Sequence, residues 1–95
     1  MSYPYSLPKS IGEIEVTVAM LRLGGKKKKL TLTQIVEKIK TMYGYKERST
    51  LPVGEVKDSM RELIAQGDII KKGNYYYLED DIFEKMKRIE KRYNL

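Results

Sequence analysis

Apolar residues recur along the first quarter of the chain with the spacing of one face of a helix. This repeat comprises Ile11, Ile14, Val18 and Leu21. Ser10 and Glu13 form a capping-box pattern at its start, and Gly24 supplies a left-handed stop at its end. The pattern predicts a helix from about Ile11 to Leu23.

A second capping box lies in the sequence LTLTQIVEKI, residues 30–39. Thr31 stands at the cap position with Gln34 three residues later, and Leu30 precedes the cap where it can staple onto Ile35. The apolar face then consists of Ile35, Val36, Ile39 and Met42. Because Gly44 ends this face, we predict a helix over residues 32–43, preceded by a strand of one or two residues at Leu30.

A third helical repeat ends at Gly67. Its apolar positions are Val56, Met60, Leu63 and Ile64. The start of this helix is ambiguous, because Pro52 pushes Leu51 out of helical geometry. The helix begins either at Pro52 or, with Gly54 as its cap, at Glu55.

Two β-prone runs in DIIKKGNYYYLED, residues 68–80, are joined by Gly73 and Asn74, a pair typical of a two-residue type II′ turn. The turn predicts an antiparallel register with the pairs Lys72 and Tyr75, Lys71 and Tyr76, Ile70 and Tyr77, and Ile69 and Leu78. Packing is the favoured role for the three tyrosines. The alternative is stacking on single-stranded nucleic acid, which calls for lysines interleaved with the rings on one face, and the acids after this run disfavour it.

Asp81 and Glu84 form the cap of a predicted fourth helix, whose apolar positions are spaced like those of a coiled coil. These positions are Ile82, Met86, Ile89 and Tyr93. The stripe either packs on the first helix of its own chain or pairs with a second copy. We expect a homodimer through this helix, because three helices and the hairpin already furnish a small core.

The order helix, short strand, helix, helix, hairpin, helix resembles a winged helix-turn-helix domain, in which the hairpin is the wing. LTLTQIVEKI is similar to the opening of the second helix in MarR-type regulators, and VKDSMRELIAQGDII, residues 56–70, is similar to the recognition helix of GntR-type regulators. The resemblance implies a mainly α fold with a small β-hairpin wing, an α+β class. It divides the chain into an extended, proline-containing arm over residues 1–9, a winged-helix domain over 10–81, and a C-terminal dimerisation helix over 82–95.

Composition narrows the chemistry that the chain can perform. The absence of cysteine and histidine removes thiolate ligands, the commonest metal ligand and the usual general base near neutral pH. We therefore expect no enzyme activity, no catalytic or metal-binding residues, no cofactor and no small-molecule ligand. The sequence shows no signal peptide or membrane-spanning stretch, so a cytoplasmic protein without a membrane partner is expected. Abundant Lys, Glu, Ile and Tyr hint at a thermophilic source of archaeal or viral type.

Positive charge is concentrated in two segments of this chain. The formal net charge is +6, and residues 26–50 hold eight Lys/Arg against two Glu, while residues 82–95 hold five against two. Localised basic segments favour a surface that faces a polyanion. The four consecutive lysines at 26–29 are either an electrostatic anchor or only the solvated tip of a loop.

The resemblance implies, by position, which residues would contact double-stranded DNA. Those nearest the base edges would be Arg48, Ser49, Thr50, Lys57 and Arg61. Phosphate contacts would come from the wing through Lys71 and Lys72, and from Thr33 with the first amides of the second helix. A basic flank around that helix would add Lys26, Lys27, Lys28, Lys29 and Lys46.

Acidic residues on the third helix depart from the family pattern. Gly54 and Glu55 stand where GntR-type regulators typically have Ser-Thr, and Asp58 and Glu62 follow on the outward face. A carboxylate can accept a hydrogen bond from cytosine, but beside phosphates it opposes binding. Two hypotheses remain. The favoured one is a small DNA-binding transcriptional regulator acting as a homodimer, and the other is a winged-helix module that docks on a basic protein within a larger assembly.

Overall fold

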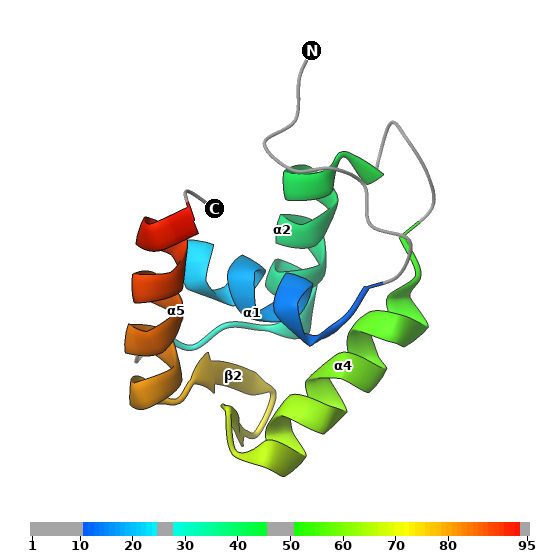
Figure 1. The fold of residues 1–95 in the computed structure, drawn as a ribbon. Coiled ribbons are helices and arrows are strands. Elements are labelled where there is room, and N and C mark those ends of the chain that lie inside the picture. Colours follow the sequence, from blue (N-terminus) through cyan, green and yellow to red (C-terminus); the bar gives the residue numbers. More distant parts are fainter. Residues whose placement is uncertain (1–10, 25–27, 46–50, 94–95) are drawn as a thin grey trace.

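The computed structural model describes residues 11–24, 28–45 and 51–93 (Figure 1). Its elements are α1 (Glu13–Arg22), α2 (Leu32–Tyr43), α4 (Val53–Gln66), β1 (Ile69–Lys72), β2 (Tyr75–Leu78) and α5 (Asp80–Tyr93). The predicted α+β class, mainly helical with one small antiparallel hairpin, is confirmed. The predicted order of elements is observed as well, including an extended position at Leu30 before α2.

Helix α1 lies at the centre of the domain, where it packs against α2, α4, α5 and β2 (Figure 1). Its buried positions run around the whole helix and are Val16, Thr17, Val18, Ala19, Met20 and Leu21. The prediction that Ile14 belongs to the core is wrong, because its side chain is 67% exposed. A helix buried on nearly all sides has no single apolar stripe, so spacing alone could not identify its exposed position.

The start of α1 also differs from the prediction. Gly12 occupies the cap position, and its backbone N–H donates to Glu15 Oε1 at 2.6 Å. The predicted cap residue, Ser10, and the arm over residues 1–9 lie outside the described residues. The segment before α1 is tied to α4 instead, because the Ser59 hydroxyl donates to the buried carbonyl oxygen of Ile11 at 3.1 Å.

Helix α2 has the bounds that the sequence predicts, residues 32–43. Thr31 Oγ1 accepts the backbone N–H of Gln34 at 3.2 Å, and Gln34 Oε1 accepts the N–H of Thr31 at 2.8 Å, which completes the capping box. Gly44 closes the helix in the left-handed region with φ of 70°. This helix is therefore fixed at both ends by local chemistry.

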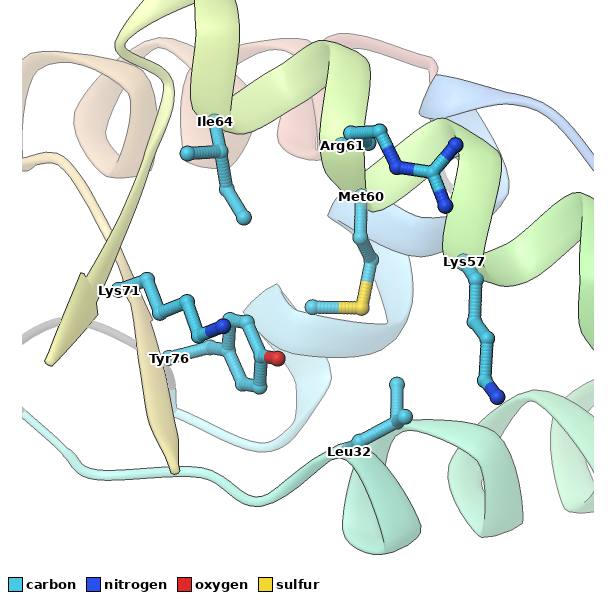
Figure 2. Close-up of a pocket in the computed structure, with 7 residues that line it drawn as sticks. All are labelled: Leu32, Lys57, Met60, Arg61, Ile64, Lys71 and Tyr76. Carbon is cyan, nitrogen blue, oxygen red and sulfur yellow. The ribbon is translucent and has the colours of Figure 1, made fainter. Parts of the chain in front are cut away.

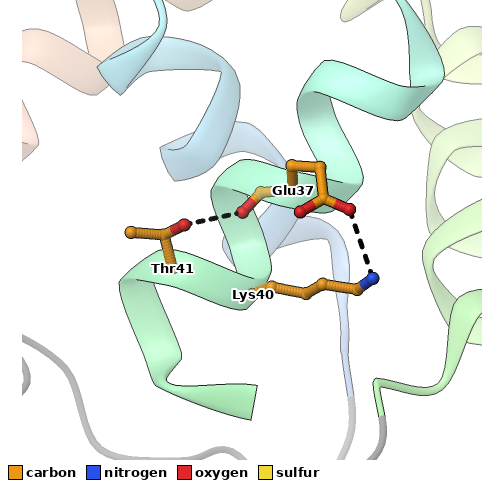
Figure 3. Close-up of polar contacts among 3 residues, drawn as sticks. All are labelled: Glu37, Lys40 and Thr41. Atoms are coloured by element: carbon orange, nitrogen blue, oxygen red, sulfur yellow. Dashed lines mark hydrogen bonds and ion pairs between the residues drawn. The ribbon is translucent and has the colours of Figure 1, made fainter. Parts of the chain in front are cut away.

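The outward side of α2 carries its own ion pair. Lys40 Nζ lies 3.2 Å from Glu37 Oε1, and the Thr41 hydroxyl donates to the Glu37 carbonyl oxygen at 3.0 Å (Figure 3). One lysine of the basic segment 26–50 is thus already paired within its helix.

Helix α4 begins at Val53 with Pro52 in the cap position, which lies between the two predicted starts. Gly67 ends it with φ of 83°, as predicted. The apolar residues Val56, Met60 and Leu63 are buried, as expected from their spacing, while Ile64 is half-buried.

The hairpin has the predicted register, with Lys72 opposite Tyr75 and Ile69 opposite Leu78 at its two ends. Gly73 takes a positive φ of 60° at the turn. Leu30 joins the other edge of β2 through a reciprocal pair of backbone hydrogen bonds with Tyr76, of 2.9 and 2.7 Å. The hairpin therefore has a third extended neighbour, and β2 is the central segment.

Helix α5 begins at Asp80, two residues earlier than the predicted start at residue 82. Glu79 rather than Asp81 stands at its start: the Glu79 carbonyl oxygen accepts the N–H of Phe83, and its carboxylate accepts the N–H of Asp81 at 2.9 Å. Ile82 and Phe83 are half-buried against the core, and α5 runs beside α1 (Figure 1). The side chains of Met86, Ile89 and Tyr93 lie outside the described residues.

Candidate functional site

A cleft of about 300 Å³ lies between α4, the hairpin and the start of α2. Its lining residues are Leu32, Lys57, Met60, Arg61, Ile64, Lys71 and Tyr76 (Figure 2). Three of the seven are cations that the sequence assigned to a DNA-binding surface. The other four supply apolar or aromatic walls, so the cleft joins positive charge to a nonpolar interior.

Helical spacing explains why α4 presents its share of this cleft. Lys57, Arg61 and Ile64 follow one another at intervals of four and three residues, so they lie along one side of the helix. Figure 2 shows these residues along the cleft with Met60 beside them, where Lys57 extends toward the start of α2 and the Arg61 guanidinium lies on the side away from β1 and β2. Lys57 and Arg61 of α4 therefore line the same cleft as Lys71 of β1.

The hairpin contributes Lys71 and Tyr76, which stand directly opposite each other in the register. Both lie on the strand face that carries the buried residues Ile69 and Leu78, because side chains two residues apart share a face. The Lys71 ammonium lies 5.9 Å from the centre of the Tyr76 ring. Lys72 points to the opposite face, so the two lysines predicted to hold phosphate together are separated by the sheet.

Leu32 brings the start of α2 to the cleft, because it is the first residue of that helix. The backbone amides at a helix start carry partial positive charge. Thr33, the next residue, is exposed, as its predicted phosphate role requires. The helix start thus adds to the positive potential of the three side chains.

An acidic stripe adjoins the cationic one on α4. Asp58 and Glu62 are exposed, as the helical periodicity predicts. Asp58 Oδ1 lies 3.1 Å from Arg61 Nη1, and the two side chains are 71% and 76% exposed. An exposed ion pair of this kind is worth about 0.2 to 1 kcal/mol, so it does not prevent Arg61 from turning to another anion.

The other predicted DNA contacts belong to the segments before and after α2. Lys28 and Lys29 are exposed at the segment that leads into Leu30. Outside the described residues lie Lys26, Lys27, Lys46, Arg48, Ser49 and Thr50. The structure therefore brings together Lys57, Arg61 and Lys71 from the predicted set, at a cleft next to Thr33.

The nonpolar part of the cleft was not predicted from the sequence. Met60 and Ile64 were predicted to be core residues, Tyr76 was predicted to pack with the other two tyrosines, and Leu32 had no predicted role. The predicted register already placed Tyr76 beside Lys71, which is a signal that could have pointed to the cleft. The position of Leu32 depends on how α2 and α4 each pack against α1, and no local pattern encodes it.

Tyr45 is a buried aromatic residue directly after α2. Burial raises the pKa of its phenol above the ordinary value of 10.0, and the carboxylates of Glu55 and Glu15 raise it further. The carboxylate of Glu55, near the start of α4, thus acts on a phenol that follows the C-terminal end of α2. In residues 11–24, 28–45 and 51–93, no helix is long and apolar enough to cross a membrane, and no acidic cluster has the make-up of a metal site.

No family model matches the chain, and no match was found among curated proteins or among solved structures.

Proposed function

We propose that this protein is a small winged-helix protein that binds double-stranded DNA and acts as a transcriptional regulator. The observation that carries the proposal is the cleft that Lys57 and Arg61 of α4 line together with Lys71 of β1, although nine residues lie between Arg61 and Lys71 in the sequence. In the resemblance noted above, these residues belong to the groove-facing helix and to the wing. Their convergence gives phosphate groups a common binding surface.

The arrangement of charge on α4 favours a particular orientation on DNA. Lys57 and Arg61 line the cleft, whereas Asp58 and Glu62 lie on the adjoining stripe. A phosphate backbone that follows the cleft contacts the cations and the start of α2, and it stays off the acidic stripe. Affinity then comes mainly from backbone contacts, and base contacts from this helix contribute a narrow specificity.

A titration at two salt concentrations tests this proposal. The probe is a fluorescein-labelled duplex of about 25 mixed-sequence base pairs, followed by anisotropy at about 50 and 200 mM salt. The variant Lys57→Gln, Arg61→Gln, Lys71→Gln removes three possible phosphate contacts. For this variant, the slope of log K against log salt concentration should be shallower by about 2.7 than for the wild type. Each lost phosphate contact on B-DNA contributes about 0.9 to that slope.

A control variant matches the loss in both charge and residue type. It combines Lys40→Gln, Lys85→Gln and Arg88→Gln, which lie on the outward side of α2 and on α5. Because these changes lower the net positive charge without removing a phosphate contact in the cleft, the slope of log K against log salt concentration should change by less than about 0.9. Equal losses in the two variants would show that net charge alone, and not the cleft, drives binding.

We further propose that α5 mediates a homodimer. The helix carries the predicted stripe Ile82, Met86, Ile89 and Tyr93, and its first member already packs on the core of its own chain. The dimer seam would therefore use the later positions. Sedimentation of the variant Met86→Glu, Ile89→Glu should give monomers at a concentration where the wild type is dimeric, and an unchanged dimer would refute the assignment.

The acidic stripe of α4 favours a second candidate, a protein-interaction module that docks on a basic partner. Val53 at the start of the helix is 39% exposed, and Asp58 and Glu62 continue along the exposed surface. On this account the variant Asp58→Asn, Glu62→Gln loses its partner in a pull-down that recovers it with the wild type. Tighter duplex binding by the same variant supports the first candidate instead.

A further inference from the structure

The face of the hairpin that points away from the cleft carries a second concentration of cations and aromatic rings. Side chains alternate along each strand, so Tyr75 and Tyr77 of β2 share this outer face with Ile70 and Lys72 of β1. Leu30 pairs with Tyr76 on the other edge of β2, which places the neighbouring Lys29 on the same outer face. The two tyrosines thus occupy the middle of three extended segments.

Lysines flank these rings from both sides. The Lys29 ammonium lies 5.6 Å from the centre of the Tyr75 ring, and the Lys72 ammonium lies 5.9 Å from the centre of the Tyr77 ring. Tyr75 is 43% exposed, and both lysines are exposed. The sequence alone suggested a run of tyrosines followed by acids, whereas the fold interleaves aromatic rings with positive charge on one surface.

We propose that this outer face binds single-stranded nucleic acid, with an unpaired base stacked on Tyr75 and a second contact at Tyr77. Lys29 and Lys72 contact the phosphates on either side of the stacked base. The site does not read the base edge, because stacking is available to every base. It is distinct from the cleft that we propose for duplex DNA, and it can hold even if that proposal fails.

The existing lysine contacts do not block the rings. An exposed cation–π contact changes an equilibrium constant by about 2- to 5-fold, whereas stacking a base on an aromatic side chain changes it by about 5- to 150-fold. A base can therefore displace the Lys29 ammonium from the Tyr75 ring. The displaced ammonium remains within reach of the adjoining phosphate, where it gains a charged partner.

The acids that follow the hairpin lie at its far end. Four residues of strand separate Tyr75 from Glu79, a distance of about 13 Å at about 3.3 Å per residue. This exceeds the Debye length of about 8 Å at physiological salt, so their repulsion at the hairpin tip is largely screened. Lys72 lies at the tip itself and Lys29 lies against Tyr75, so the local charge there is positive.

Oligothymidylate of about 15 nucleotides is a suitable probe, because it forms no duplex and matches the site size of common single-strand binders. By anisotropy, Tyr75→Leu should weaken its binding about 5-fold or more, while Tyr75→Phe should retain it because the ring is kept. Lys29→Gln and Lys72→Gln should each lower the salt slope by about 0.7. Binding of the mixed-sequence duplex should be unchanged in Tyr75→Leu, which separates this site from the cleft.

A tryptophan reporter tests the contact directly, since the chain has no tryptophan. Fluorescence of Tyr75→Trp should be quenched by oligothymidylate, and that of Phe83→Trp on α5 should be unaffected. Equal oligothymidylate binding by the wild type and Tyr75→Leu would overturn the proposal. So would an unquenched Tyr75→Trp that binds the probe, because the strand would then lie elsewhere on the protein.

Discussion

Removal of the carboxylate of Asp58 should strengthen binding of duplex DNA. Asp58 holds Arg61 at 3.1 Å, and Arg61 lines the cleft. The substitution Asp58→Asn frees this guanidinium for a phosphate and also removes one negative charge beside the DNA backbone. A loss of charge on a helix would thus produce a gain in affinity, which is the opposite of what a partner-docking role for Asp58 requires.

The gain in affinity has two contributions, the release of Arg61 from its ion pair and the removal of one negative charge beside the DNA. Releasing an exposed ion pair is worth about 0.2 to 1 kcal/mol, or about 1.4- to 5-fold in affinity. The repulsion of two unit charges about 8 Å apart in water is about 0.5 kcal/mol, and screening over one Debye length leaves about 0.2 kcal/mol. Together they predict binding tighter by about 2- to 8-fold.

A double-mutant cycle measured by anisotropy separates these terms. In the background Arg61→Gln, Asp58→Asn should improve affinity by only about 1.4-fold, because no guanidinium remains to be released. The control Glu37→Gln frees Lys40 from an ion pair of similar geometry on the outward side of α2 (Figure 3). It changes the net charge equally and should improve affinity less than about 2-fold. If Asp58→Asn weakens duplex binding, or does no better than Glu37→Gln, the reasoning about the cleft is refuted.

The remaining predictions concern stability. Thr31→Ala should lower the free energy of unfolding by about 1 kcal/mol in urea, because the cap bond is lost, while Thr33→Ala on the exposed side should cost less than about 0.5 kcal/mol. Ser59→Ala should cost about 1 to 3 kcal/mol by leaving the buried Ile11 carbonyl without its donor, and a change near zero would contradict that role. The raised pKa of Tyr45 makes the unfolded phenol ionise first as the pH rises through 10.0, so stability should fall above that pH. Tyr45→Phe should show a smaller fall, and a pH profile identical to that of the wild type would exclude the effect.

Local chemistry explains which parts of the fold were predictable. Thr31, Gln34 and Gly44 fix α2 through contacts within four residues, and both of its ends were predicted correctly. Gly73 and Asn74 likewise determine the register of the hairpin. In these elements the residues that encode the structure are neighbours in the sequence.

Longer-range packing explains the errors. Ile14 belongs to a helix surrounded by neighbours, and only their positions decide which residue is exposed. Glu79 replaces Asp81 at the start of α5 because its N–H donates to the Asp68 carbonyl oxygen at 3.0 Å, which anchors the chain where the helix begins. No pattern of polar and apolar residues around Glu79 predicts its hydrogen bond to Asp68.

The candidate site was predictable in part. The cations Lys57, Arg61 and Lys71 follow from the order of the elements, whereas Leu32 reaches the cleft only through the packing of α2 against its neighbours. The contact of Lys29 with the outer face of the hairpin depends on the pairing of Leu30 with β2. The sequence predicted that strand but not its partner.

The central claim is that duplex DNA binds along the cleft between α4 and the hairpin. A ¹⁵N–¹H correlation titration of the labelled protein with the mixed-sequence duplex tests it most directly, because every backbone amide reports its own surroundings. The account predicts that the largest shifts fall on residues 31–33, 57–64 and 69–76. Shifts confined to the outward side of α2 at residues 37–41, or spread evenly over the basic residues of α5, would contradict it.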